Sequence, residues 1–233
     1  MASTGVAALL VTCTAQAACA TGFPGDLPVA AVPPRPGKAD IDPLLAEMTP
    51  RRLVVAGTDA DLAAVLVRLL RTERLDVEVA YVSIHRSSDA ARTWGLPRGR
   101  AARELALHGT ARPAPLVRDD VGGVLVGRGE IRGLHGECYC DETLVLRGRT
   151  PRLVVAPTPD GVAVRAGRGR RLPSGAVRAV PQTTRSGRGA AIGRAVQVGC
   201  LPATVLCDGV AHPRPVERFT WFRHTSDWLL VRG

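Results

Sequence analysis

Lysine and aromatic residues are scarce in this sequence. Lys38 is the only lysine among 31 Lys and Arg residues, and aromatic side chains make up 3% of the 233 residues. A P-loop needs Lys between Gly and Ser or Thr at a helix start, and a protein kinase needs a lysine on a strand. We place Lys38 in a Pro/Gly-rich loop, which excludes both classes. A nucleotide would therefore be held by backbone amides and arginines, and Val, Leu and Ala must fill the core.

Long apolar runs are also missing. No stretch of 18 apolar residues occurs, so the sequence predicts no transmembrane helix. Residues 1–20 are apolar and rich in small side chains, as in a signal peptide, but they lack the basic start of one. We interpret 6–12 as a buried strand instead and expect a cytoplasmic protein.

None of the six cysteines forms a Cys-x-x-Cys pair. Cys138 and Cys140 alternate with Tyr139, which on a strand puts both thiols on one face. A zinc site that adds Cys200 and Cys207 has no standard spacing. Buried thiols are the default in a cytosolic protein, so no metal site is predicted.

The formal net charge is +10. Such a charge fits an anionic partner, namely a nucleotide, a phospholipid headgroup or a nucleic acid. A coding preference for Arg over Lys explains it equally well. Charge alone therefore leaves the partner open.

Strands and helices alternate in the first half. Leu62, Val65, Leu66 and Leu69 follow helical spacing, and short apolar runs lie between the predicted helices. This alternation predicts a parallel sheet with helices on its faces over residues 1–114. The predicted strands are 6–12, 27–32, 52–56 and 77–84, and the predicted helices are 40–50 (capped by Asp40), 59–70, 87–94 and 100–108.

The second half, 115–233, has short Val/Leu runs separated by Gly, Pro and Asp. Strands at this spacing with turn signals predict an antiparallel β-sandwich. The predicted strands are 123–126, 142–146, 153–156, 162–165, 203–207 and 229–232.

Two strand-to-helix turns are candidates for a ligand site. They are residues 56–62 and 84–89, at the ends of the third and fourth predicted strands. Ligands of open parallel sheets bind at the carboxyl ends of strands, and two helix starts with Arg86 between them suit a phosphate. Two ordinary turns with Asp or Ser caps explain the same residue types.

The segment 53–65 resembles the strand–loop–helix of diacylglycerol kinases and related lipid kinases, whose core the NAD kinases share. That family has Gly-Gly-Asp-Gly-Thr-Leu-Asn-Glu-Val where this chain has Gly-Thr-Asp-Ala-Asp-Leu-Ala-Ala-Val. The matching positions are Gly57, Asp59, Leu62 and Val65, whereas Thr58, Ala60 and Asp61 stand for Gly, Gly and Thr.

A second segment, 85–97, resembles the family's Gly-Thr-Gly-Asn-Asp-Phe-Ala-Arg followed by Gly-Leu-Pro. Asp89, Ala91, Arg92 and 95–97 match, but the Gly-Thr-Gly-Asn core does not. Further departures lie elsewhere: the family's Asn-Pro after the first strand is absent, Val210 replaces the Glu of Asp-Gly-Glu, and no segment supplies a catalytic base, the nearest stretch being 181–184.

The resemblance implies an N-terminal parallel-sheet nucleotide-binding lobe followed by a C-terminal antiparallel β-sandwich. The ancestral reaction would be ATP-dependent phosphorylation of a lipid hydroxyl in a cleft between the lobes. Mg²⁺ would accompany ATP, with Asp61 and Asp208 as carboxylates, and arginines in 165–194 would meet anionic lipid at a membrane surface. The residues implied to line the nucleotide are Gly57, Thr58, Asp59, Ala60, Asp61, Arg86, Ser87 and Ser88.

The departures favour loss of activity. Thr58 adds a side chain where phosphate approaches the backbone, and Asp61 adds a repelling charge. The alternative hypothesis is therefore a non-catalytic module that binds a ligand or partner protein. It predicts that Thr58 and Asp61 fill the loop. Nucleic-acid binding through the Arg/Gly stretch has no recognition motif in its favour.

Overall fold

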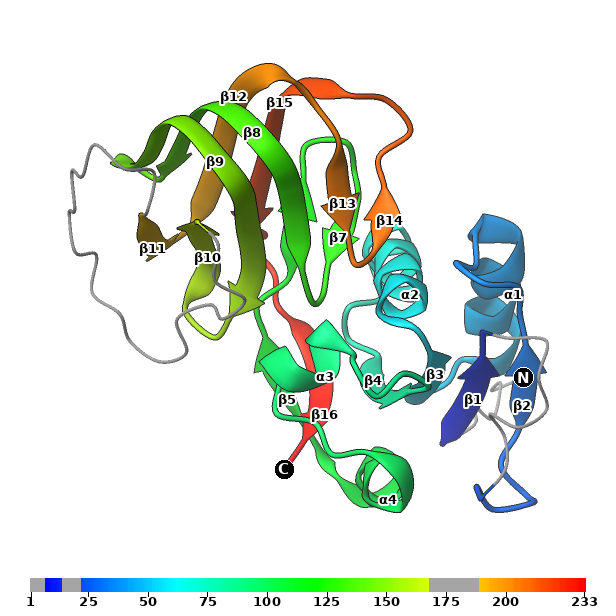
Figure 1. Ribbon diagram of the computed structural model, residues 1–233. Coiled ribbons are helices and arrows are strands. Elements are labelled where there is room, and N and C mark those ends of the chain that lie inside the picture. Colours follow the sequence, from blue (N-terminus) through cyan, green and yellow to red (C-terminus); the bar gives the residue numbers. More distant parts are fainter. Residues whose placement is uncertain (1–6, 14–21, 168–188) are drawn as a thin grey trace. The chain divides into compact units, whose positions relative to one another are not determined.

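The computed structural model describes residues 7–13, 22–167 and 189–233. The chain forms two compact units, one made of the residues up to Ala114 together with Ser226–Gly233, and the other of Pro115–Thr225 (Figure 1). Residues 1–6, Cys19, the stretch 181–184 and most of the Arg/Gly-rich segment lie outside the described residues.

The first unit contains a six-stranded sheet. Its strand order is β2-β1-β3-β4-β16-β5, and all neighbours pair in parallel except β16 and β5. The parallel sheet predicted from the alternating pattern is therefore confirmed. The strands are β1 Ala8–Thr12, β2 Val29–Ala31, β3 Arg52–Gly57, β4 Glu78–Ser83, β5 Thr110–Ala114 and β16 Trp228–Arg232.

Among the described residues, four helices connect these strands. They are α1 Lys38–Met48, α2 Asp59–Arg71, α3 Asp89–Thr93 and α4 Gly99–His108. Lys38 begins α1 rather than lying in a loop, and Asp40 is not the cap. Gly37 is the capping residue, and its N–H donates a hydrogen bond of 2.7 Å to the carboxylate of Asp40. Asp40 lies in the first turn, where the helix dipole favours a negative charge.

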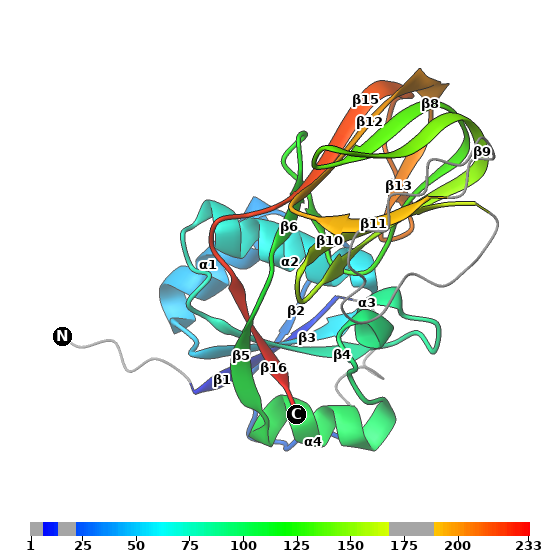
Figure 2. The same cartoon turned by 90° about the vertical axis from the view of Figure 1, so that its left-hand side faces the viewer.

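Helices cover both faces of the sheet (Figure 2). On one face α4 packs Ala102 and Ala106 against Val54 and Val231. On the other face α2 buries its apolar stripe of Leu62, Val65, Leu66 and Leu69 against β3. Burial on both faces explains why β1 and β3 read as continuous apolar runs.

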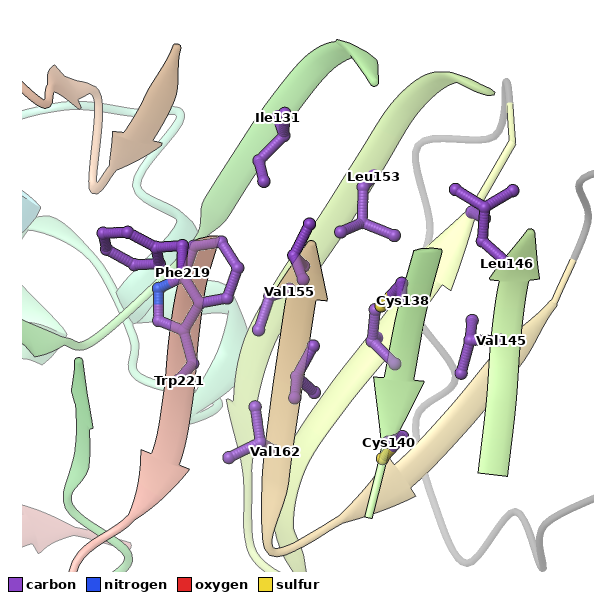
Figure 3. Close-up of a cluster of buried hydrophobic side chains, with 14 of the residues drawn as sticks. Ile131, Cys138, Cys140, Val145, Leu146, Leu153, Val155, Val162, Phe219 and Trp221 are labelled. Atoms are coloured by element: carbon purple, nitrogen blue, oxygen red, sulfur yellow. The ribbon is translucent and has the colours of Figure 1, made fainter. Parts of the chain in front are cut away.

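The second unit is an antiparallel sheet that curls around a core of Val and Leu side chains with Phe219 and Trp221 (Figure 3). The antiparallel β-sandwich class that we predicted for this half is confirmed. Its strand order is β11-β10-β9-β8-β12-β15-β6-β7; outside this order β13 pairs with β8, and β14 pairs with β13. The strands are β6 Val117–Asp119, β7 Val124–Leu125, β8 Gly129–Cys140, β9 Thr143–Thr158, β10 Gly161–Ala166, β11 Ala190–Gly193, β12 Ala195–Ala203, β13 Val205–Cys207, β14 Val210–Ala211 and β15 Val216–Arg223.

The predicted last strand lies in the other sheet. β16, which we assigned to the β-rich half, pairs in parallel with β4 and antiparallel with β5 in the first unit. Its apolar residues complete that core: Trp228, Leu230 and Val231 are fully buried. Sheet membership of a five-residue apolar strand depends on long-range pairing, which the strand's own sequence does not encode.

Within the described residues, no helix has the length and apolarity needed to cross a membrane.

Candidate functional site

The two predicted turns are neighbours. β3 and β4 are adjacent parallel strands whose last paired residues are Gly57 and Ser83, so both strands end at the same edge of the sheet. α2 begins directly after β3, and α3 begins six residues after β4. The structure therefore brings the predicted site residues together at one edge, as the spacing indicated.

Asp61 fills the start of α2. Its carboxylate accepts the N–H of Thr58 at 2.7 Å, the hydroxyl of Thr58 at 2.8 Å and the N–H of Arg35 at 2.7 Å. Thr58 in turn caps the helix, because its oxygen accepts the N–H of Asp61. Only 1% of Asp61 is exposed. The Thr58 amide, at the point where a phosphate would approach the loop, is thus already hydrogen-bonded to the Asp61 carboxylate.

Gly57 is required by this arrangement. A Cβ atom placed there would lie 2.8 Å from a carboxylate oxygen of Asp61 and 3.1 Å from Cβ of Cys13. The glycine that matches the lipid kinases therefore makes room for Asp61 in this chain.

Asp59 ties the second turn to the first. Its carboxylate accepts four hydrogen bonds: from the Tyr81 hydroxyl at 2.8 Å, the Ser88 hydroxyl at 2.5 Å, and the N–H groups of Asp89 at 2.7 Å and Ala90 at 3.1 Å. The two backbone donors belong to the first turn of α3. A carboxylate from α2 therefore occupies the helix start where we predicted a second phosphate contact.

Tyr81 stays protonated in this network. Burial raises the pKa of its hydroxyl, and the nearby charge of Asp59 raises the pKa further. The hydroxyl therefore serves as a fixed donor to Asp59 rather than as a general base.

The remaining predicted residues have simpler positions. Ser88 is buried and caps α3 by accepting the N–H of Ala91 at 2.9 Å. Ala60 is half-buried in the first turn of α2, and Arg86 and Ser87 are exposed. Capping, the alternative that we weighed for these turns, accounts for Thr58, Asp61 and Ser88.

Sequence reasoning missed two members of the site. Tyr81 lies in the middle of an apolar strand, where an aromatic residue predicts packing. The backbone of Arg35 reaches Asp61 from 26 residues away along the chain, with a left-handed φ of 53°. No local pattern predicts a backbone donor at that separation.

The loop offers little to a triphosphate. Two carboxylates, Asp59 and Asp61, lie within three residues of each other, and Arg86, the cation that we predicted for this site, is exposed. Asp208, our second candidate for holding Mg²⁺, is committed to the N–H groups of Val126, Gly127 and Arg128. In the described ranges, no group of three or more His, Cys, Asp or Glu side chains is arranged to hold a metal ion. These residues do not fit ATP with Mg²⁺.

Two of the cysteines of the second unit face its core, whereas Cys200 and Cys207 are partly buried. Cys138 and Cys140 are buried in its core, and burial raises the pKa of both thiols, that of Cys140 to about 12. Thiols that stay protonated at neutral pH are poor metal ligands and nucleophiles.

No family model matches the sequence, and no curated protein matches it either. Solved structures do. A diacylglycerol kinase from Bacillus anthracis str. Sterne has a TM-score of 0.73 at 10% identity, covering 98% of this chain and 97% of that one. An NAD kinase from Archaeoglobus fulgidus in complex with ATP has a TM-score of 0.57 at 12% identity, with 97% and 94% covered. Yeast NADH kinase complexed with NADH has a TM-score of 0.52 at 7% identity, covering 98% of this chain and 84% of that one.

At such low identity these likenesses concern the fold. They cover both units and nearly the whole chain, and they agree with the two segments that resemble lipid kinases. The chain therefore has the fold of the diacylglycerol kinases and NAD kinases, in a strongly diverged sequence.

Proposed function

We propose that this chain is a non-catalytic protein with a diacylglycerol kinase fold, which binds a ligand or partner and does not transfer phosphate from ATP. One observation carries the proposal: the buried carboxylate of Asp61 accepts the Thr58 amide at the loop where a triphosphate would have to bind. Bringing a polyanion to this loop would place like charges a few ångströms apart and break the cap of α2.

Lipid phosphorylation is the competing function. The fold and the retained Asp59 favour it, since the family's loop carries Asp at this position. Phosphoryl transfer, however, depends on cations placed against the developing charge. This loop instead carries an additional anion, Asp61, where the family has Thr.

The test restores the family's loop. The triple variant Thr58→Gly/Ala60→Gly/Asp61→Thr recreates Gly-Gly-Asp-Gly-Thr, and Thr58→Gly/Ala60→Gly is the matched control that keeps Asp61. Binding of ATP with Mg²⁺ is measured by calorimetry and by the shift in Tm, which must rise when a ligand binds only the folded state. We expect no shift for the wild type or the control at millimolar ATP, and a shift for the triple variant.

A kinase assay with diacylglycerol in mixed micelles completes the test. Wild-type protein that binds ATP or phosphorylates diacylglycerol would overturn the proposal. ATP binding by the Asp61-retaining control that is as tight as binding by the triple variant would show that Asp61 does not block the loop.

A further inference from the structure

An open pocket lies in the first unit, at the end of β16 and the start of β5. Its volume is about 530 Å³, which is within the range of small-molecule sites. The side chains that line it are Trp94, Pro97, Leu105, Arg112 and Arg232, with two glycines. None of these residues belongs to the turns 56–62 and 84–89, although Trp94, Gly95 and Pro97 end the segment 85–97 that resembles the lipid kinases.

The two arginines lie on one face of the sheet. Leu230 pairs with Arg112 across the antiparallel ladder of β16 and β5, and Arg232 lies two residues beyond Leu230. Side chains in this diagonal relation come within reach of a shared ligand. Arg232 is steadied by a hydrogen bond from its guanidinium to the carbonyl of Pro113 at 3.1 Å.

No carboxylate of the described chain forms an ion pair with Arg112 or Arg232. Elsewhere in this unit arginines do find acidic partners, as in the Arg52–Glu78 and Arg68–Asp42 pairs. Two arginines thus line the pocket without an ion-pair partner among the described residues.

The other side chains that line the pocket form an apolar wall. Trp94 is 6% exposed and meets Trp228 edge to face, with ring centroids 6.1 Å apart. Leu105 is half-buried and packs against the core beneath α4. Aromatic pairs of this kind stabilise each other beyond simple burial, so the wall keeps its shape without a ligand.

We propose that this pocket binds an acidic amphiphile, a molecule with one carboxylate or phosphate group and a short apolar body. Arg112 and Arg232 would hold the anionic group, since guanidinium groups pair with carboxylate and phosphate through two parallel hydrogen bonds. Trp94, Pro97 and Leu105 would cover the apolar part. The site is independent of whether the Gly57–Asp61 loop binds ATP.

The test uses octyl phosphate, octanoate, octanol and inorganic phosphate, each titrated calorimetrically below the concentration at which it self-associates. One of the two acidic amphiphiles is expected to bind at one saturable site, at least about tenfold more tightly than octanol or phosphate alone. The tighter of the two identifies the headgroup. Equal binding of octanol would overturn the proposal, as would no binding of either acidic amphiphile at millimolar concentration.

Variants locate the site. Arg112→Gln/Arg232→Gln is expected to weaken binding at least about tenfold, while Arg71→Gln/Arg100→Gln, which removes the same charge from exposed helix positions, leaves it unchanged. Arg112→Gln alone touches no ion pair of the described chain, so it preserves the fold if the double variant does not. Unchanged affinity in the Arg112 and Arg232 variants would overturn the assignment.

Discussion

At the scale of single residues, Glu130 in β8 is a buried carboxylate that pairs with three arginines. Its side chain is 3% exposed and pairs with Arg128 at 2.6 Å, Arg152 at 3.3 Å and also Arg132. Burial by itself would raise the pKa of Glu130, but the three arginines outweigh burial and hold the pKa below its ordinary value. The folded state therefore favours the ionised carboxylate.

Glu130→Gln is expected to lower the free energy of unfolding by about 2–3 kcal/mol at pH 7, somewhat less than for a fully buried pair because Arg132 is 65% exposed. A lowered folded pKa means that the stabilisation is present above the unfolded value of 4.5 and is lost as the pH falls through the folded value. Urea unfolding from pH 7 to pH 3 should show the two proteins converging below pH 4.5.

Glu137→Gln is the control, because its pair with Arg147 is exposed and screened by solvent, so its loss should change the stability much less. A wild type whose stability does not fall between pH 4.5 and pH 3 faster than that of Glu130→Gln would contradict the ion-pair account.

Residue identities in the loop could be predicted only in part. The sequence identified Asp61 as a negative charge out of place and a serine, Ser87 or Ser88, as the cap of the second helix; in the structure Asp61 fills the loop and Ser88 is the cap. It did not reveal that Asp59 binds α3, because the sequence does not show which groups a carboxylate in a first helical turn will accept. Asp59 has its own helix start and that of α3 within reach, and tertiary packing decides between them.

At the scale of secondary-structure elements, α3 depends on Asp59. A helix of five residues is too short to be stable by itself. Three of the four donors to Asp59 come from Ser88 and the first turn of α3. The carboxylate thus acts as an anchor that fixes α3 beside α2.

Asp59→Ala is expected to release α3. Amide hydrogen exchange in residues 88–93 should accelerate by at least about tenfold, since each charged hydrogen bond lost costs about 1.5–3 kcal/mol. Ser87→Ala, which changes an exposed neighbour, should leave the exchange of this segment as in the wild type. Exchange that stays slow in Asp59→Ala would mean that packing of Ala90 and Ala91 alone holds the helix.

Most elements of the first unit could be predicted because the spacing of the apolar residues and the positions of the turn residues indicate the same boundaries there. In the apolar stripe of α2, in the turn at 56–62 and in the apolar strands β1 and β3, the local sequence preference agrees with the tertiary fold. β16 could not be assigned to its sheet, because an apolar strand fits either core and only long-range pairing decides.

At the scale of the whole molecule, the two units differ in whether one continuous segment of the chain supplies the whole hydrophobic core. The core of the second unit is formed by residues between Val117 and Trp221, all within one continuous stretch. The first unit needs β16, which supplies buried Trp228 and Leu230 and separates β4 from β5.

Fragment 115–225 is therefore expected to fold alone, with a cooperative thermal transition and dispersed NMR resonances. Fragment 1–114 is expected to remain unfolded or to aggregate, because β4 and β5 would both expose unpaired edges. Adding a synthetic peptide of residues 226–233 in excess should partly restore its circular dichroism. A folded 1–114 without the peptide would show that β16 is dispensable.

The position of β16 also bears on synthesis at the ribosome. Residues up to Ala114 emerge first, but their closing strand is translated only after the whole of Pro115–Thr225. At about 5–20 residues per second, the nascent N-terminal portion waits roughly 6 to 22 seconds with an open sheet. During that interval it is a natural client for chaperones, whereas the later-made β unit folds as soon as its own strands have left the exit tunnel.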